Sequence, residues 1–496
     1  MKTAKKILSL LLILALLLGT AACGSGSPSQ GGGTVPPAPD ASGESSETPA
    51  TPGEAAQPWA PQLSDEDRAI VEKLGTLTHH SPVTEDSLSW SFDSSSGTLT
   101  VSGSGPMKDY SSDDPSPAQE YGEAVTRIVV EDGITTVGAY AFCNLYWCES
   151  AQLPDSVEYI GDWAFANDYY LADVPFTANL KEIADHAFAD VMGHKPLVIP
   201  EGIEIIGKFA FAANVFYDTI SIPASAYYIE ETAFANSLAV HEYIVDENNP
   251  NYTDVDGVLF SKDLSVLMDY PIYKTETHYD IPDTVTRIGD WAFFQNCFLK
   301  TVTIPASVTE VGEYLFRDLD YMEEYIVDEN CPLLKSVDGV LYSKDMKVLY
   351  DYPCHKAADV FIIPDSVETI SASCFLVCDR LGTLVVPGTV KTVVKDAFAQ
   401  FRGVIYLAEE FTSKEVGNAA LFSEATDYGF DYSHDLTYVP PTQRDPGTDG
   451  VEFPTVHVDG TTVYYAGSQE QWDEFVEQCE IHLGDTAVIC GTPYPG

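Results

Sequence analysis

Basic residues are scarce in this sequence. Lys and Arg number 25 among 496 residues, against 76 Asp and Glu, so the formal net charge is −51 at pH 7. Because such a chain would repel nucleic-acid phosphates, we expect no nucleic acid among its partners. Long apolar runs are scarce as well. The longest, from Ile7 to Leu18, is shorter than the roughly 20 residues of a standard transmembrane helix.

Sequence motifs of catalysis and of metal binding are also missing. No nucleophile elbow, phosphate-binding loop or paired-histidine zinc helix occurs, and the ten His are scattered. Isolated carboxylate pairs are too common in an acidic chain to indicate a hydrolase. The Asp and Asn residues from Asp246 to Asp256 lack the ligand spacing of a calcium loop, and turn formation explains them better. We therefore expect no catalytic residues, no metal and no cofactor.

The N-terminus has the order of features of an export signal. Three lysines precede the run from Ile7 to Leu18, and small residues then lead to Cys23. This order resembles a bacterial lipoprotein signal, which implies a signal peptide at 1–22 and lipidation of Cys23, with simple secretion as the alternative. Acyl chains on Cys23 would hold the protein on a membrane without crossing it. Residues 23–62, rich in Gly, Ser, Pro and Thr, are predicted to be a disordered linker.

A motif that ends in Ala-Phe or a near equivalent recurs through the middle of the chain. Its phenylalanines are Phe142, Phe165, Phe188, Phe211, Phe234, Phe293, Phe316, Phe375 and Phe398. Most are 23 residues apart, and two gaps of 59 residues equal one period plus an insertion of 36. A fixed period over nine copies predicts a solenoid in which each copy is one coil stacked on its neighbours.

Each copy predicts the same local structure. A strand such as 301–304 ends at a proline, which has no amide proton to donate to a central ladder. A second extended piece such as 308–311 follows, with β-branched residues facing inward. Four residues before the Phe, five copies have a Gly such as Gly161, which we interpret as a position of positive φ. The next residue is acidic in five copies, as at Asp162, and is interpreted as the N-cap of a short helical turn.

Two segments carry a family resemblance. Residues 281–293 read Ile-Pro-Asp-Thr-Val-Thr-Arg-Ile-Gly-Asp-Trp-Ala-Phe, and residues 304–312 read Ile-Pro-Ala-Ser-Val-Thr-Glu-Val-Gly. They resemble BspA-type leucine-rich repeats, which occur in bacterial surface proteins. The resemblance implies a β-rich (α/β) solenoid, a right-handed stack of 23-residue coils. The copy that ends at Phe188 departs from the pattern, because Pro175 lies two residues farther from the Phe than usual.

The solenoid is predicted to span residues 127–410 and to contain two matching insertions. These begin with the similar segments 243–248 and 325–330, and each continues through a Ser-Lys-Asp turn to Asp-Tyr-Pro. We expect both insertions to form β-hairpins that project from the stack.

The segments that flank the solenoid are predicted to close its ends. Residues 63–126 are expected to form a cap of one short helix and one β-hairpin, because an open end would expose sheet edges. Residues 411–450 are expected to finish the solenoid and continue as a linker. Residues 451–496 are predicted to be a small strand–helix–strand unit with Ser468 as the helix cap. Its Tyr-Tyr-x-Gly-x-x-x-x-Trp motif resembles the closing motif of the same family.

Cysteine usage is compatible with an oxidising compartment. Nine cysteines remain besides Cys23, so at least one is unpaired within a monomer. The second insertion has Cys331 and Cys354 where the first has Asn and Ile. Because both change in the same copy, we hypothesise a disulfide between them. Cys479 and Cys490 form a weaker candidate pair.

One row of side chains is a candidate binding surface. The position two residues before the Phe is aromatic at Tyr140, Trp163, Phe209, Trp291 and Tyr314. At solenoid spacing these rings would form a stripe suited to a protein or a glycan, although simple packing between coils is the alternative. The leader predicts a lipid-anchored, extracellular-facing bacterial surface protein, and the family resemblance implies adhesion or another interaction with an extracellular or host protein, without catalysis. A glycan-binding module and a structural envelope protein remain as alternatives.

Overall fold

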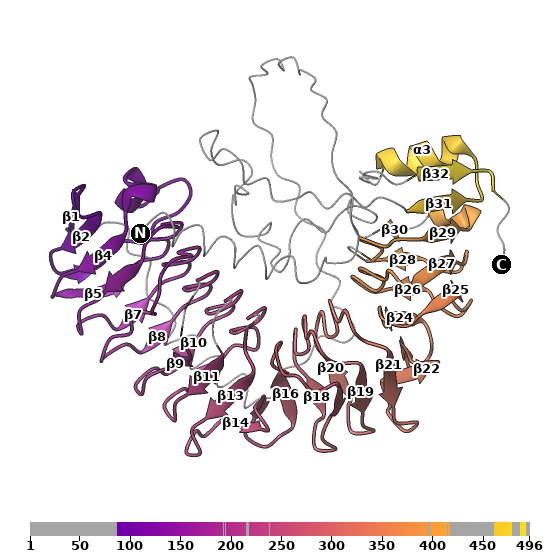
Figure 1. Cartoon of the computed structure of the whole chain (residues 1–496), viewed down its shortest axis with the longest axis horizontal. Coiled ribbons are helices and arrows are strands. Elements are labelled where there is room, and N and C mark those ends of the chain that lie inside the picture. The colour runs from indigo at the N-terminus through magenta and orange to yellow at the C-terminus, as the bar shows by residue number, and fades with distance from the viewer. Residues whose placement is uncertain are drawn as a thin grey trace, which may run out of the picture. The chain divides into compact units, whose positions relative to one another are not determined.

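The structure is a computed structural model that describes residues 87–191, 193, 195–214, 218–237, 239–394, 397–413, 415–416, 461–478 and 487–492. Over these residues the chain is a stack of coils, and equivalent strands of neighbouring coils pair in parallel (Figure 1). The predicted β-rich solenoid is thereby confirmed. The predictions for residues 1–86, which include the leader, Cys23, the linker and a short helix, lie outside the described part, as does the linker expected before residue 451.

Most coils contribute a longer strand that ends near the proline, and these strands form four sheets. Their bounds are β1 Ser89–Asp93, β2 Thr98–Ser102, β4 Arg127–Val130 and β6 Ser150–Gln152; β9 Leu197–Val198, β11 Thr219–Ile222 and β13 Glu242–Val245; β17 His278–Asp280, β19 Thr301–Ile304 and β21 Glu324–Val327; and β25 Ala358–Ile362, β27 Leu381–Val386, β29 Val404–Leu407, β31 Thr462–Tyr465 and β32 Ala487–Cys490.

Each coil then adds a short strand to a second set of sheets, which also includes the strands of the insertions. Their bounds are β3 Gly105–Pro106, β5 Ile134–Val137, β7 Tyr159–Ile160, β8 Glu182–Ile183, β10 Ile205–Ile206 and β12 Tyr228–Ile229; β14 Tyr252–Val255, β15 Val258–Ser261, β16 Val266–Asp269, β18 Arg287–Ile288 and β20 Glu310–Val311; and β22 Leu334–Val337, β23 Val340–Ser343, β24 Val348–Asp351, β26 Thr369–Ile370, β28 Thr392–Val393 and β30 Glu415–Val416.

The register phenylalanines form the centre of the core. Phe142, Phe165, Phe188 and Phe211 are fully buried, and neighbouring rings stack with centroids 5.2 to 5.6 Å apart. The backbone supports the same register, since the amide of Phe142 donates to the carbonyl of Ala164 in the next coil. Phenylalanines that are 23 residues apart in the sequence therefore stack as a ladder of rings in the core.

The copy with the displaced proline interrupts the sheet of longer strands. Between Leu171 and Thr177 the described chain contains no strand, and a tight turn joins the amide of Phe176 to the carbonyl of Val174. The first sheet accordingly ends at β6 and the next begins at β9. The irregular spacing noted in the sequence thus marks a real break in the ladder.

The glycine found in five of the coils serves close packing, not positive φ, so that interpretation was wrong. Gly161 is absent from the glycines with positive φ, and a Cβ placed on it would lie 2.7 Å from the amide nitrogen of Ala139 in the preceding coil. Positive φ instead occurs two residues before the Phe, for example at Trp163 with φ 57°. The glycine is needed because a side chain would push the coils apart.

The acidic residue after this glycine also differs from its prediction as an N-cap. No helix begins there in the described coils. The carboxylate of Asp162 instead accepts a hydrogen bond from the amide of Asp185 at 3.2 Å, and Asp185 accepts one from the amide of Lys208 at 2.7 Å. Each carboxylate therefore satisfies a backbone amide of the next coil, and the acidic row is a ladder between coils.

The two insertions form the expected hairpins but do not project. In the first, β14 pairs antiparallel with β15, β15 pairs antiparallel with β16, and β16 pairs parallel with β18 of the next coil. Leu259, Phe260 and Leu267 are at most 1 % exposed. The prediction of projecting hairpins is therefore corrected, because their apolar side chains are buried within the stack.

A hydrogen bond between a tyrosine and an aspartate holds each insertion in place. The hydroxyl of Tyr243 donates to Asp269 at 2.6 Å, and the hydroxyl of Tyr325 donates to Asp351 at 2.5 Å. Burial raises the pKa of Asp269 to about 7, although the bond from Tyr243 opposes this shift. The tyrosine that follows each aspartate, Tyr270 for example, takes the place of a register phenylalanine and stacks on Phe293.

The strands predicted for the two end units pair with the neighbouring coils of the described stack. At the N-terminal end the hairpin of β1 and β2 continues the first sheet, because β2 pairs parallel with β4. Two 3-10 helices, η1 Pro117–Glu120 and η2 Gly122–Ala124, follow.

At the other end, β31 pairs parallel with β29 and with β32, so the C-terminal unit extends the last sheet (Figure 1). The 3-10 helix η3 Glu409–Ser413 precedes it, and α3 spans Gln469–Gln478. Ser468 caps α3 by accepting a hydrogen bond from the amide of Gln471 at 3.2 Å, while the Gln471 side chain accepts from the Ser468 amide at 2.7 Å. This reciprocal pair is a capping box.

Candidate functional site

The predicted aromatic stripe exists as a continuous row of ring contacts, which we call the inner row. It comprises Tyr140, Trp163, His186, Phe209, Trp291 and Tyr314, and all six have positive φ between 49° and 60°. The turn before the register phenylalanine requires this backbone conformation. Neighbouring ring centroids lie 4.1 to 6.1 Å apart along the row.

Burial limits what the inner row can contact. Trp163 is 6 % exposed and Phe209 is 8 % exposed, whereas Tyr140, Trp291 and Tyr314 are half-buried. Burial and the nearby Lys208 lower the pKa of His186 to about 3, so this ring is neutral at neutral pH. Packing between coils therefore accounts for Trp163 and Phe209, and the half-buried members are the ones placed to touch a ligand.

A second aromatic group, which sequence reasoning missed, lies after the register phenylalanine. We call it the outer row. It comprises Tyr146, Trp147, Tyr169, Tyr170, His241, Tyr273, Phe298, Tyr321 and His355, none of which is buried. A period of 23 residues relates Tyr146-Trp147 to Tyr169-Tyr170 in the sequence, and this signal was available.

Ring contacts connect the outer row between coils. Tyr146 stacks on Tyr169 with centroids 5.4 Å apart, and Trp147 stacks on Tyr170 at 4.9 Å. Farther along, Tyr273 contacts both His241 and Phe298 at 5.2 and 5.3 Å. Tyr321, which is 46 % exposed, contacts His355 at 5.4 Å. The outer row therefore presents partly exposed aromatic surface on several coils of the solenoid.

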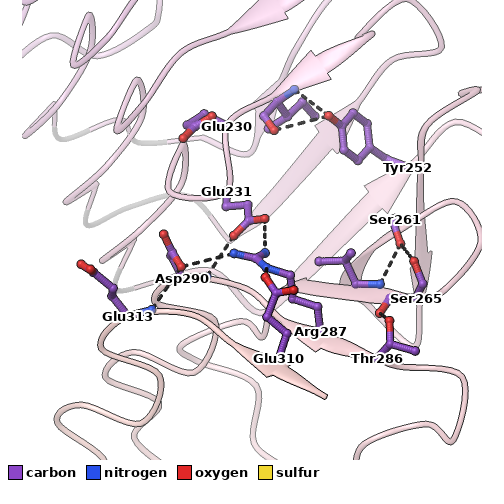
Figure 2. A network of polar contacts seen from close by, with 12 residues as sticks. Glu230, Glu231, Tyr252, Ser261, Ser265, Thr286, Arg287, Asp290, Glu310 and Glu313 are labelled. Carbon is purple, nitrogen blue, oxygen red and sulfur yellow. Dashed lines mark hydrogen bonds and ion pairs between the residues drawn. The ribbon is translucent and has the colours of Figure 1, made fainter. Parts of the chain in front are cut away.

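A polar network spans the first insertion. Figure 2 shows Arg287 of β18 among three carboxylates: it donates to Glu231, to Glu310 at 2.6 Å and to Asp290 at 3.4 Å. Glu231 also accepts the amide of Asp290 at 3.0 Å, which continues the acidic ladder over a gap of 59 residues. The hydroxyl of Tyr252 accepts a hydrogen bond from the amide of Ile229 at 2.8 Å and lies 3.3 Å from the carbonyl of Ile229, to which it can donate. These contacts provide hydrogen-bond partners for the backbone at the end of β12 and join this strand to the next block of coils.

Like charges perturb one part of the acidic ladder. Burial, together with the nearby Asp162 and Asp185, raises the pKa of Glu182 to about 7. In the described ranges no three His, Cys, Asp or Glu side chains lie close enough together to hold a metal ion. Asp246, considered above for calcium, instead accepts hydrogen bonds from the amide and the side chain of Asn248 at 2.8 and 2.9 Å, as turn chemistry predicts.

The structure does not bring Cys331 and Cys354 together. Neither is bonded to another cysteine in the structure. Cys331 is fully buried and contacts the carbonyl of Val308 in the preceding coil, whereas the Cys354 sulfur lies 2.9 Å from that of Cys378 in the following coil. The hypothesised pair is therefore corrected, because its two members face opposite neighbours. Cys479, a member of the weaker pair, lies outside the described residues.

Across the ranges that the structure describes, no helix is long and apolar enough to cross a membrane. Cys23, the candidate lipidation site, lies outside the described residues.

Solved structures similar to this chain are bacterial repeat proteins. A leucine-rich repeat protein from Eubacterium ventriosum is 22 % identical, with a TM-score of 0.51, covering 70 % of this chain and 95 % of its own. The pneumococcal vaccine antigen PcpA is 16 % identical, with a TM-score of 0.42 and coverages of 82 % and 98 %. A leucine rich cell surface protein from Faecalibacterium prausnitzii is 17 % identical, with a TM-score of 0.37 and coverages of 80 % and 98 %.

Comparison with curated proteins gives no match. The family model described as the BspA type leucine rich repeat region matches residues 120–253, 270–337 and 352–426, which together make up more than half of the chain. These ranges contain the register phenylalanines, the glycines and the prolines that build the coils. The chain belongs to the BspA-type leucine-rich repeat family.

Proposed function

We propose that this protein is a lipid-anchored surface protein that binds another protein through the outer row, without catalysis. The observation that carries the proposal is the set of partly exposed ring contacts on neighbouring coils, above all Trp147 on Tyr170 and Tyr146 on Tyr169. Aromatic side chains combine large apolar area with few rotatable bonds, and they are enriched at protein interfaces.

The geometry of these rings favours a protein over a glycan. Sugars stack on open ring faces, but Trp147 and Tyr170 cover one face of each other at an interplanar angle of 13°. Less ring face is therefore left for a sugar, whereas ring edges and the Tyr170 hydroxyl suit irregular protein side chains. The net charge of −51 further favours a partner with a basic surface, because complementary charge speeds association.

The inner row supports the same proposal with fewer residues. Tyr140, Trp291 and Tyr314 are half-buried and would contribute to a binding surface, whereas Trp163 and Phe209 would hold the coils in place behind it. An extracellular or host protein is the partner class that we propose. A glycan ligand and a purely structural role are the competing outcomes of the test.

The binding test compares two matched pairs of stacked rings. Residues 24–496 are applied to arrays of extracellular-matrix proteins and of glycans, together with a Trp147→Ala, Tyr170→Ala variant. The control is Tyr406→Ala with Tyr464→Ala, because those rings stack at 4.9 Å on the last sheet and are also half-buried. We expect saturable protein binding that weakens at least tenfold in the outer-row variant and stays unchanged in the control.

Other outcomes contradict parts of the proposal. Glycan binding alone would replace the protein partner with a sugar, and equal losses in both variants would remove the site from the outer row. Absence of saturable binding on both arrays would favour a structural role. Circular dichroism of each variant checks that the fold is retained.

Anchoring is tested separately with the full chain. The lipid attachment that we propose at Cys23 should place the protein in the membrane fraction, and Cys23→Ala should release it to the soluble fraction. A membrane fraction that is unchanged by Cys23→Ala would refute lipidation as the anchor.

A further inference from the structure

Two thiols lie unusually close where the chain leaves the second insertion, Cys354 at its end and Cys378 in the next coil. The sulfur atoms of Cys354 and Cys378 are 2.9 Å apart, and a small adjustment would bring them to the about 2.05 Å of a disulfide. Each sulfur also reaches the backbone of the other coil. The Cys354 sulfur lies 2.9 Å from the Leu376 carbonyl, and the Cys378 sulfur lies 3.8 Å from the Tyr352 carbonyl.

The first insertion shows what these two positions do when no cysteine is present. Shifting by 82 residues places Ile272 at the position of Cys354 and Asn296 at that of Cys378. The Asn296 side chain donates to the carbonyls of Pro271 and Ile272 at 2.9 and 3.0 Å. Its oxygen accepts from the amides of Phe298 and Leu299 at 2.9 and 2.8 Å. A fully hydrogen-bonded amide therefore fastens these two coils.

A cysteine at the position equivalent to Asn296 loses these hydrogen bonds between the coils. A thiol is a weak donor and cannot reproduce the amide's set of bonds. Both members of the contacting pair nevertheless differ together between the first insertion with its following coil and the second, Ile to Cys and Asn to Cys. A covalent link between the same two coils would replace what the amide supplies, and it explains the joint change.

We infer that Cys354 and Cys378 form a disulfide in the exported protein and thereby join the coil that leaves the second insertion to the next coil. The oxidant is an external disulfide, such as glutathione disulfide or the disulfide of an envelope thiol oxidase. The Cys354 thiolate attacks one of its sulfurs and releases one thiolate. The Cys378 thiolate then attacks the mixed disulfide and releases a second. Two protein thiols are oxidised and one external disulfide is reduced to two thiols.

Burial affects the timing of this reaction. Cys378 is fully buried, and burial is the main cause that raises the pKa of its thiol, so little thiolate forms once the coils have closed. We therefore expect oxidation during folding. Once formed, the bond should resist dithiothreitol in native buffer and yield to it in denaturant.

Peptide mapping of the unreduced full chain tests the assignment. After purification with glutathione disulfide, free thiols are alkylated in denaturant and the chain is digested with trypsin and chymotrypsin. Trypsin separates Cys354, which precedes Lys356, from Cys378, which precedes Arg380, and chymotryptic cleavage after Phe375 separates Cys378 from Cys374. We expect a peptide pair that joins Cys354 to Cys378, with Cys331 and Cys374 alkylated.

Alkylation of both Cys354 and Cys378, or a bond from Cys354 to Cys331 or Cys374, would overturn the inference. A second variant tests the equivalence of the two insertions independently. Ile272→Cys with Asn296→Cys should form a further disulfide at the matching place. Failure of that bond to form in a folded variant would contradict the geometric argument.

Discussion

Replacing Arg287 by Met should weaken the joint between the two blocks of coils on either side of the first insertion. The first sheet of short strands ends at β12, and the next continues from β16 to β18. Arg287 of β18 reaches back over this joint to Glu231, and it also donates to Glu310 and Asp290 (Figure 2). Methionine keeps much of the side-chain volume but removes the charge and every donor.

The magnitude follows from the burial of these groups. The Arg287 side chain is 19 % exposed, and the side chains of Glu231 and Glu310 are 28 % and 34 % exposed. Removing one partner of a fully buried pair costs about 3–5 kcal/mol, whereas an exposed pair contributes about 0–1 kcal/mol. Two close bonds at intermediate burial should cost about 2–3 kcal/mol, in part because three carboxylates then face one another without a cation.

Urea denaturation followed by circular dichroism measures the total loss, and hydrogen exchange locates it. Exchange should rise in β12, β18 and β20 and stay unchanged in β26. Arg127→Met is the matched control, because Arg127 is exposed and donates to Gln152 at 3.3 Å. A double-mutant cycle with Glu231→Gln should give a coupling of about 1–2 kcal/mol. A loss equal to that of the control, or exchange that rises evenly along the stack, would refute this reasoning.

Three further predictions concern the core, the ladder and the coil spacing. Phe211→Ala removes a fully buried ring from the phenylalanine stack and should cost about 3–5 kcal/mol, so an unchanged urea midpoint would exclude the ring ladder as the core. The pKa of Glu182 rises from 4.5 to about 7 on folding, so the native state holds an extra proton and its stability should fall as pH rises from about 4.5 to 7. Glu182→Gln should therefore stabilise the protein at pH 8, by up to about 3 kcal/mol, and have little effect at pH 4, while the exposed Glu158→Gln should be neutral at both; urea midpoints at the two pH values check this. Gly161→Ala should cost about 1–3 kcal/mol, because its Cβ would lie 2.7 Å from the Ala139 amide nitrogen, and a stabilised variant would disprove the packing role of this glycine.

Several roles could not be derived from one copy of the repeat considered alone. The recurring glycine and the recurring acidic residue, each present in five copies, were assigned to local backbone effects, as position-by-position reasoning suggests. Their real partners lie one coil away, at Ala139 for Gly161 and at Asp185 for Asp162. Contacts between coils depend on the stacking distance, and no residue within a single copy encodes that distance. The cysteine pairing failed for the same reason, since Cys354 faces the following coil and not its own insertion.

The sequence by itself determined the solenoid, its 23-residue register, the irregular copy at Pro175 and the helix cap at Ser468, because each of these depends on spacing along the chain. Tertiary structure alone decided which aromatic rings remain accessible, how the insertions merge with the stack and which thiols meet. Trp163 and Trp147 illustrate the difference: one is 6 % exposed and the other is not buried. A turn with positive φ directs the first ring into the space between coils, and exposure of this kind is fixed only when neighbouring coils pack.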